Sequence, residues 1–160
     1  GQEHSVPMQI TETVIKVNEE IKRSMIDKLL LLCDDSFNGK TIAVLGVTFK
    51  PNTDDMRDAP SLTIVPALVG AGAKVVVCDP QGRHEGDALL PGVTWAEDAY
   101  AAAQAADLCV LLTEWNEFRA LDLKRIAQDM RSPCFADLRN VYSAKDLKQA
   151  GFQKFTFVGR

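Results

Sequence analysis

From residue 41 onward, short apolar runs alternate with segments of helical pattern, and this alternation restricts the possible folds more than any other feature of the chain. The first run, 41–47, is rich in β-branched residues, which is typical of a buried parallel strand. Further strands are predicted at 74–78, 93–95, 108–112, 133–136 and 155–158. Helices are predicted between them at 61–72, 97–106, 121–130 and 143–150. We therefore expect an α/β fold, a doubly wound, parallel, Rossmann-like sheet of about six strands.

One long helix is predicted ahead of the sheet, over residues 8 to 33. Apolar residues recur at steps of three and four, which places them on one helix face. Examples are Val14, Val17, Ile21, Met25 and Leu29. A face this apolar has to be covered, either by the domain that follows or by another subunit. The polar break at 34–39 predicts the linker, so we expect two parts, residues 1–38 and residues 39–160.

Prolines complicate one of the predicted helices. Pro66 lies inside the segment 61–72. Because proline removes a backbone N–H donor and clashes with the preceding turn, we expect it to kink or end that helix.

The charge balance and the apolar runs exclude several classes of protein. Eighteen Lys and Arg stand against 22 Asp and Glu, for a net charge of −4. A nucleic-acid-binding protein usually has a basic excess, so no nucleic-acid partner is expected. No apolar run approaches the roughly 20 residues that cross a bilayer, and the N-terminus lacks the pattern of a secretion signal. No membrane partner is expected.

Four cysteines are present, and none belongs to a C-x-x-C motif. They are Cys33, Cys78, Cys109 and Cys134. Their apolar neighbours predict buried, reduced thiols in a cytoplasmic protein. A nucleophilic cysteine needs a polar and partly exposed environment, so no catalytic residue is predicted in this chain.

The loops at the carboxyl ends of the strands are where an open parallel sheet binds its ligands. After the first strand, Gly46 begins such a loop, but Thr48 and Pro51 stand where the fingerprint G-x-G-x-x-G requires glycine. That fingerprint lets the backbone approach a pyrophosphate. Its absence argues against NAD in the usual place of a dinucleotide-binding domain.

The loop 48–61 is longer than a plain connection between a strand and a helix, and it is charged. Lys50 suits a phosphate group, although a solvated surface lysine is the alternative. Phe49 offers an apolar surface to a base or a sugar. Asp54 and Asp55 are interpreted as loop residues, paired within the loop or with Arg57, rather than as metal ligands or acid–base groups. No metal site is predicted.

Arg139 follows the fifth strand and therefore lies on the same edge of the sheet as Lys50. We expect these two cations to face one pocket and to hold a diphosphate. A structural ion pair between Arg139 and Asp137 is the alternative. Asp79, after the second strand, either holds a ribose hydroxyl or forms a turn with Pro80. Trp115 either lines the site or packs.

The stretch 46–61, GVTFKPNTDDMRDAPS, closely resembles the signature loop in the C-terminal domain of the UDP-glucose/GDP-mannose dehydrogenase family. Three further motifs occur in the family's order, at 78–80, 113–118 and 137–140. Residues 14–18 resemble the end of the family's central helical domain, so the resemblance covers nearly the whole chain. The form Phe-Lys-Pro-Asn-Thr-Asp-Asp looks most like bacterial members that act on UDP-glucose.

The resemblance implies an oxidoreductase that converts the C6 alcohol of a nucleotide sugar to a carboxylate in two steps with two NAD. A cysteine carries a thiohemiacetal and then a thioester. Both its motif and the NAD-binding domain would lie upstream of residue 1, so we expect this fragment to be inactive alone. By the resemblance, Phe49 and Lys50 contact the UDP-sugar, Arg139 contacts its nucleotide part, and Arg57 reaches the NAD. The long helix resembles the family's dimer-forming helix, which implies a homodimer.

Three other interpretations of the sequence are possible: another sugar nucleotide as substrate, a signalling module, and an NAD oxidoreductase of another family. Members that act on GDP-mannose or UDP-N-acetyl-hexosamines differ only mildly in the loop. A receiver-like signalling module has the same sheet order, but it needs an acidic pair directly after the first strand and a lysine after the fifth. Here the acids come late in the loop and Arg139 takes the place of lysine. The missing glycine loop argues against a complete NAD oxidoreductase of another family.

Overall fold

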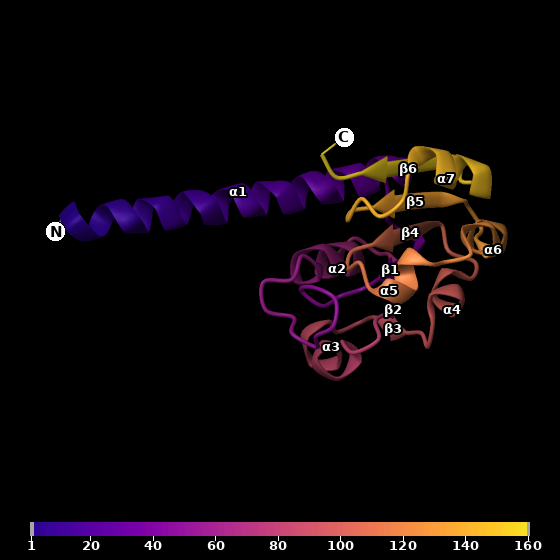
Figure 1. The fold of residues 1–160 in the computed structure, drawn as a ribbon, viewed down its shortest axis with the longest axis horizontal. Helices are drawn as coiled ribbons and strands as arrows, with labels where there is room; N and C mark the ends of the chain where they lie inside the picture. Colours follow the sequence, from indigo (N-terminus) through magenta and orange to yellow (C-terminus); the bar gives the residue numbers. More distant parts are fainter. Residues whose placement is uncertain (1, 160) are drawn as a thin grey trace.

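A single long helix projects from an α/β domain (Figure 1). The computed structural model describes the backbone of residues 2–159 and the side chains of residues 12–159. Its helices are α1 (Gln2–Leu32), α2 (Ser61–Gly70), α3 (Arg83–Leu89), α4 (Ala99–Ala103), α5 (Asn116–Arg119), α6 (Leu123–Asp129) and α7 (Ala144–Ala150). Its strands are β1 (Thr41–Leu45), β2 (Lys74–Cys78), β3 (Thr94–Trp95), β4 (Leu108–Leu111), β5 (Cys134–Asp137) and β6 (Lys154–Phe157).

All six strands run parallel in the order β3-β2-β1-β4-β5-β6. The chain builds one half of the sheet outward from β1 and then returns to build the other half from β4. The strand order therefore reverses between β1 and β4, the position where such sheets bind ligands. The predicted doubly wound, Rossmann-like fold of six strands behind a long helix is confirmed.

Alternate residues of each strand supply two separate cores, because successive side chains of a strand point to opposite faces. On one face, Ile42 and Val44 of β1 pack in a cluster with Leu29 of α1 and Leu68 of α2. On the other face, apolar side chains from β1, β4 and β5 pack against α4, α5, α6 and α7. Burial on both faces explains why the strands are apolar throughout rather than alternating with polar residues.

Only the C-terminal end of α1 belongs to the domain. Leu29 is fully buried, whereas Val14, Val17 and Ile21 are about half exposed, at 53%, 47% and 46%. Lys28 fastens this end, since its Nζ donates to the carbonyl of Phe157 at 2.6 Å. The domain thus covers the last part of the apolar face and leaves the middle of the helix uncovered. The division of the chain after residue 38 stays a prediction.

The structure departs from the predicted elements in three places. Helices α3 and α5 were not predicted, because both are short and polar and lack a repeated apolar face. Pro66 neither ends α2 nor marks a boundary: the helix runs from Ser61 to Gly70 with Pro66 exposed on its outer side. The first strand ends at Leu45 rather than at residue 47, because Gly46 has a φ of +89° that turns the chain out of the sheet.

All four cysteines are buried and unpaired, as predicted. Burial raises the pKa of Cys33 to about 11 and the pKa of Cys78 to about 12, and it raises the pKa of Cys109 and Cys134 as well. These thiols stay protonated at neutral pH, which argues against a nucleophilic role for any of them. Among the described residues, no helix combines the length and the apolar character that spanning a membrane requires.

Candidate functional site

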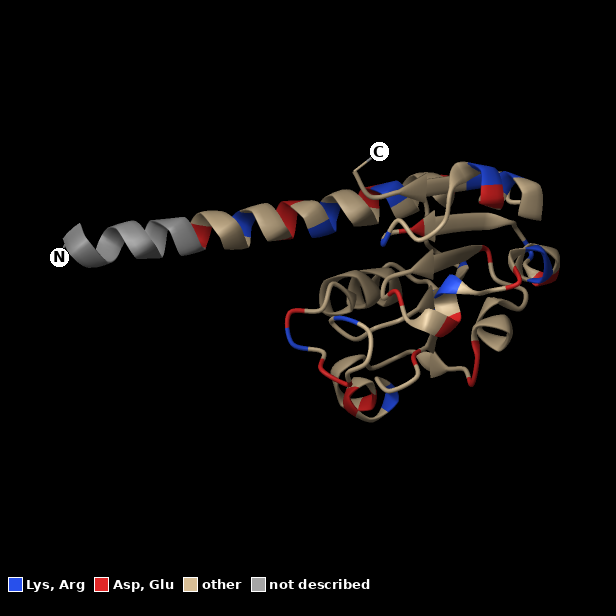
Figure 2. Cartoon of the chain, viewed as in Figure 1, with Lys and Arg blue, Asp and Glu red and all other residues tan. Residues whose placement is uncertain are grey.

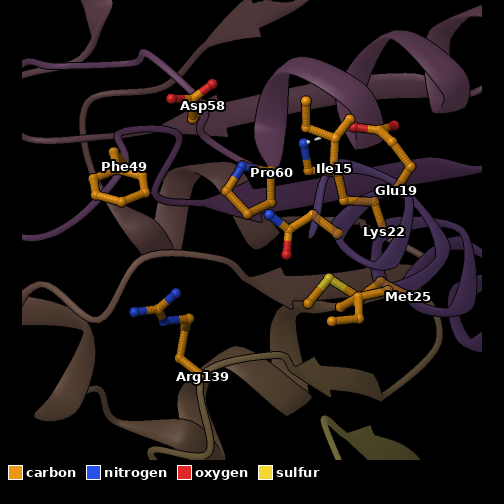
Figure 3. Close-up of a pocket in the computed structure, with 10 residues that line it drawn as sticks. Ile15, Glu19, Lys22, Met25, Phe49, Asp58, Pro60 and Arg139 are labelled. Carbon is orange, nitrogen blue, oxygen red and sulfur yellow. Dashed lines mark hydrogen bonds and ion pairs between the residues drawn. The ribbon is translucent and has the colours of Figure 1, made fainter. Parts of the chain in front are cut away.

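A pocket of about 480 Å³ lies at the carboxyl edge of the sheet, between α1 and the loops that follow β1 and β5. The two loops and the helix, three segments far apart in sequence, face one another across it (Figure 3). Phe49, Asp58, Pro60 and Arg139 come from the loops, and Ile15, Asn18, Glu19, Ile21, Lys22 and Met25 come from the helix. The pocket therefore combines a loop rim that carries Asp58 and Arg139 with a helical wall that is half apolar and half polar.

The loop after β1 is fixed at its start by Gly46 and Thr48. At Gly46 a Cβ atom would collide with Thr113, so only glycine allows β1 and the loop after β4 to approach this closely. Thr48 is buried, its carbonyl accepts from the hydroxyl of Thr113 at 2.8 Å, and its own hydroxyl accepts from Nε1 of Trp115 at 3.3 Å. Trp115 is buried and packs behind the loop rather than lining the pocket.

Asp79, directly after β2, accepts hydrogen bonds from the same loop. Its Oδ2 accepts from the backbone N–H of Val47 at 2.7 Å and of Thr48 at 3.2 Å. Its Oδ1 accepts from the N–H groups of Gln81 and Gly82 at 3.0 and 2.7 Å. Asp79 thus forms the turn that was one of its two predicted roles, and it also binds the backbone of the loop after β1.

Asp137 acts in the same way on the loop after β5. It is fully buried, and it accepts from the backbone N–H of Arg139 at 3.2 Å and of Tyr142 at 2.6 Å. The guanidinium of Arg139 forms its ion pair with Glu114, not with Asp137. The alternative interpretation, an ion pair between Arg139 and Asp137, is therefore wrong: from Arg139, Asp137 accepts only the backbone N–H, and Glu114 on the loop after β4 pairs with the guanidinium.

Lys50 and Arg57 lie on the same loop as Phe49 but outside the pocket. Lys50 is exposed and does not belong to the ten residues that line the pocket, so the structure brings Phe49 and Arg139 together there but not Lys50. The side chain of Arg57 is 88% exposed and forms an ion pair with Asp55 at 2.9 Å.

Asp55 has the loop role expected from the sequence. Its hydrogen bonds with the side chain and the backbone N–H of Arg57 lower its pKa to about 2, and the nearby charge of Lys50 acts in the same direction. It therefore stays ionised at neutral pH. Among the described residues, no group of three His, Cys, Asp or Glu side chains is arranged to hold a metal ion.

The helical wall of the pocket and the contact between Arg139 and Glu114 were not predicted from the sequence. The apolar face of the helix was expected to be covered by the following domain or by another subunit, and no pocket was predicted there, yet Asn18 and Lys22 lie on the side of α1 that faces the loops. Two polar residues four positions apart beside an apolar face were the available signal. Glu114 was part of a noted motif, but no local pattern indicated its contact with Arg139, 25 residues further along the chain.

Charge is mixed around this edge rather than concentrated in one sign. Acidic and basic residues are interspersed along the described part of α1 and along the loop between β1 and α2 (Figure 2). Within the pocket, Lys22 Nζ lies 3.2 Å from Glu19 Oε1. Arg139 and Lys22 are the cations there, and Glu19 and Asp58 are the acids. Because the acids offset the cations, an anionic ligand would have to bind Arg139 or Lys22 directly rather than a general positive field.

Comparison with known proteins gives a consistent result. Residues 43–144 match the model of the UDP-glucose/GDP-mannose dehydrogenase family, UDP binding domain. The whole chain is 45% identical to the UDP-glucose 6-dehydrogenase of Rhizobium meliloti (strain 1021), covering 36% of that protein. It is 39% identical over 147 residues to UDP-glucose 6-dehydrogenase TuaD of Bacillus subtilis (strain 168), covering 91% of this chain and 32% of that protein. The chain thus spans about a third of the length of these curated relatives.

A solved structure agrees with these matches. The UDP-glucose dehydrogenase of the hyperthermophilic archaeon Pyrobaculum islandicum superposes with a TM-score of 0.75 at 29% identity. The superposition covers 95% of this chain and 32% of that one.

The collision at Gly46 predicts a stability difference between two glycines. Gly46→Ala should lower the free energy of unfolding by about 3 kcal/mol or more, because a left-handed backbone and a steric overlap with Thr113 act together. Gly39→Ala is the matched control: Gly39 has a φ of +75° but nothing within 4 Å of its Cβ position, so a loss of about 1–2 kcal/mol is expected. Urea denaturation measures both, and equal losses would contradict the close approach at Gly46.

Proposed function

Because the chain belongs to the UDP-glucose/GDP-mannose dehydrogenase family, we propose that it is the nucleotide-sugar-binding part of an NAD-dependent UDP-glucose 6-dehydrogenase. The observation that carries this proposal is the pocket at the carboxyl edge, where Phe49 and Arg139 meet beside α1. The most similar of the relatives described above carry the UDP-glucose name, which favours glucose over mannose or an N-acetyl-hexosamine as the sugar.

The pocket residues suit the parts of a UDP-sugar. Phe49 is 46% exposed and presents an apolar surface on which a uracil or a sugar ring can pack. Glu114 engages Nε of Arg139, which leaves the two terminal nitrogens of the guanidinium available to fork onto an anionic oxygen. Lys50 is exposed next to Phe49, outside the pocket, and its long side chain has the reach to turn toward a diphosphate.

NAD does not fit at the usual place in this domain. In a dinucleotide-binding domain the first loop donates backbone N–H groups to the pyrophosphate. Here the N–H groups of Val47 and Thr48 are already bonded to Asp79. We propose that NAD binds elsewhere in the full-length enzyme and that Arg57, exposed at the tip of the loop, reaches it there.

This chain therefore contributes binding and orientation rather than bond-making. Its four thiols are buried and protonated, so the thioester chemistry of the full-length enzyme requires a cysteine outside them. The unpaired thiols also favour a cytoplasmic location, where cysteines stay reduced. We expect no oxidation of UDP-glucose by this chain alone, and NADH absorbance measures this directly.

Lys50 and Arg139 should each contribute to UDP affinity. A charge-assisted hydrogen bond is worth about 1.5–3 kcal/mol, so Lys50→Ala and Arg139→Ala should each weaken UDP binding about 10- to 100-fold. Lys74→Ala is the matched control, because Lys74 is an exposed lysine at the start of β2, on the opposite edge of the sheet. Titration calorimetry measures all three. A loss of affinity in the control equal to that in the site variants would indicate nonspecific charge attraction instead.

We also propose that the uncovered face of α1 forms a homodimer. Val17→Glu should convert the dimer to a monomer, because it places a charge on the exposed apolar face. Leu89→Glu is matched to it: both side chains are apolar and 47% exposed, but Leu89 lies on α3. Light scattering after gel filtration measures the mass of each variant. A monomeric wild-type chain, or a dimer that survives Val17→Glu, contradicts the proposal.

A further inference from the structure

We propose that Asp79 is a positioning residue for nucleotide-sugar binding, because its carboxylate fixes the backbone from which Phe49 and Lys50 project. This inference rests on the proposed function. Asp79 does not line the pocket, and its carboxylate accepts hydrogen bonds from Val47, Thr48 and the turn at 81–82. Its effect on a ligand must therefore pass through the loop.

The carboxylate takes the place that a phosphate has in a dinucleotide-binding domain. There, backbone N–H groups after the first strand point at the pyrophosphate of the ligand. Here the N–H groups at the same position, those of Val47 and Thr48, point at Oδ2 of Asp79. The carboxylate of Asp79 thus orders this loop, and the loop needs no dinucleotide to keep its conformation. Phe49 and Lys50, which follow in the loop, can then bind another ligand.

Thr48 carries the constraint from Asp79 toward the pocket. Its hydroxyl lies 3.3 Å from Asp79 Oδ2 and 3.1 Å from the carbonyl of Lys50, which places the Lys50 backbone directly against this group. The backbone N–H of Phe49 donates to the carbonyl of Asp55 at 2.8 Å, and this hydrogen bond closes the loop between residues 49 and 55. Phe49 is therefore held between a buried anchor and a loop closure, and its ring is left 46% exposed.

Substitution by asparagine gives a sharp test, because the side chain keeps its shape. Oδ1 and Oδ2 of Asp79 each accept from at least two donors. In asparagine an NH₂ group replaces one of these oxygens, and in either orientation of the amide this NH₂ group faces backbone N–H donors with which it cannot form a hydrogen bond. Asp79→Asn also removes the negative charge that all four N–H groups face, so the hydrogen bonds that hold the loop of Val47 and Thr48 weaken in either orientation of the amide.

Asp107 provides a matched control at the opposite edge of the sheet. It is 8% exposed, against 9% for Asp79. It also accepts from a backbone N–H, that of Thr41 at 2.8 Å, and it pairs with Arg131 at 3.5 Å. Asp107→Asn thus disturbs a buried carboxylate of the same kind just before β4, away from the pocket. Any effect shared by both variants is a general loss of stability.

Two measurements on the intact chain separate positioning from stability. Hydrogen exchange followed by NMR reports the closure of the loop at the Phe49 amide. In Asp79→Asn this amide should exchange about tenfold faster or more, whereas Asp107→Asn should leave it unchanged. Calorimetry with UDP should give an affinity about tenfold weaker in Asp79→Asn and unchanged in Asp107→Asn.

Each outcome decides one of the two proposals. Unchanged exchange at Phe49 in Asp79→Asn overturns the positioning role, whether or not UDP binds. Equal UDP affinities for wild type and Asp79→Asn overturn it too. A wild-type chain that does not bind UDP contradicts the proposed function, and the exchange rates then decide the role of Asp79 by themselves.

A milder variant covers the case in which Asp79→Asn does not fold. Thr48→Val keeps the shape of the side chain but removes the hydroxyl that lies between Asp79, Trp115 and Lys50. Loss of the hydrogen bonds of this hydroxyl predicts exchange at Phe49 about fivefold faster or more and UDP binding about fivefold weaker or more. Wild-type values for both would overturn the proposal.

Discussion

Buried carboxylates at the ends of two strands accept the backbone N–H groups of the loops that build the site. Asp79 directly follows β2 and accepts from the loop after β1, and Asp137 at the end of β5 accepts from the backbone of Arg139. A buried carboxylate is stable only where donors surround it, so each acid and its loop fix one another. The rim of the pocket therefore depends on these two acids, because Phe49 and Arg139 project from backbone that they hold in place.

The long helix completes the pocket from outside the sheet. The domain buries Leu29, and Lys28 ties the same end of α1 to Phe157, so the helix leaves the domain in a fixed direction. The next part of α1 supplies the wall opposite the loops (Figure 3), and its remaining apolar side chains stay uncovered. In our proposals, one helix thus serves ligand binding on one side and subunit contact on another.

The fold was predictable from the sequence because its signals are local. Apolar β-branched runs between helices predict a parallel sheet, and strands at 41–47 and 108–112 were placed to within two residues. The shared edge of the loops after the first and fifth strands followed from topology, but the prediction put Lys50 beside Arg139, whereas Phe49 lines the pocket with it. The contacts of the site did not follow from topology, because they join loops from different strands. Nothing near Glu114 indicates Arg139 as its partner, and Asp79 with Pro80 predicts a turn without revealing that Val47 and Thr48 donate to it. The position of Lys50 outside the pocket was not predictable either, because the folded conformation of the loop sets the direction of an exposed side chain.

We propose that this edge of the sheet binds a nucleotide diphosphate through the loops after β1 and β5, not through the first backbone N–H groups after β1. An NMR titration of the labelled chain with UDP tests it most directly. The account predicts that the resonances of Phe49, Lys50 and Arg139 move together, with smaller changes along the facing side of α1 at Lys22. Changes centred on the amides of Val47 and Thr48, or confined to the amino edge of the sheet near Lys40, would contradict it.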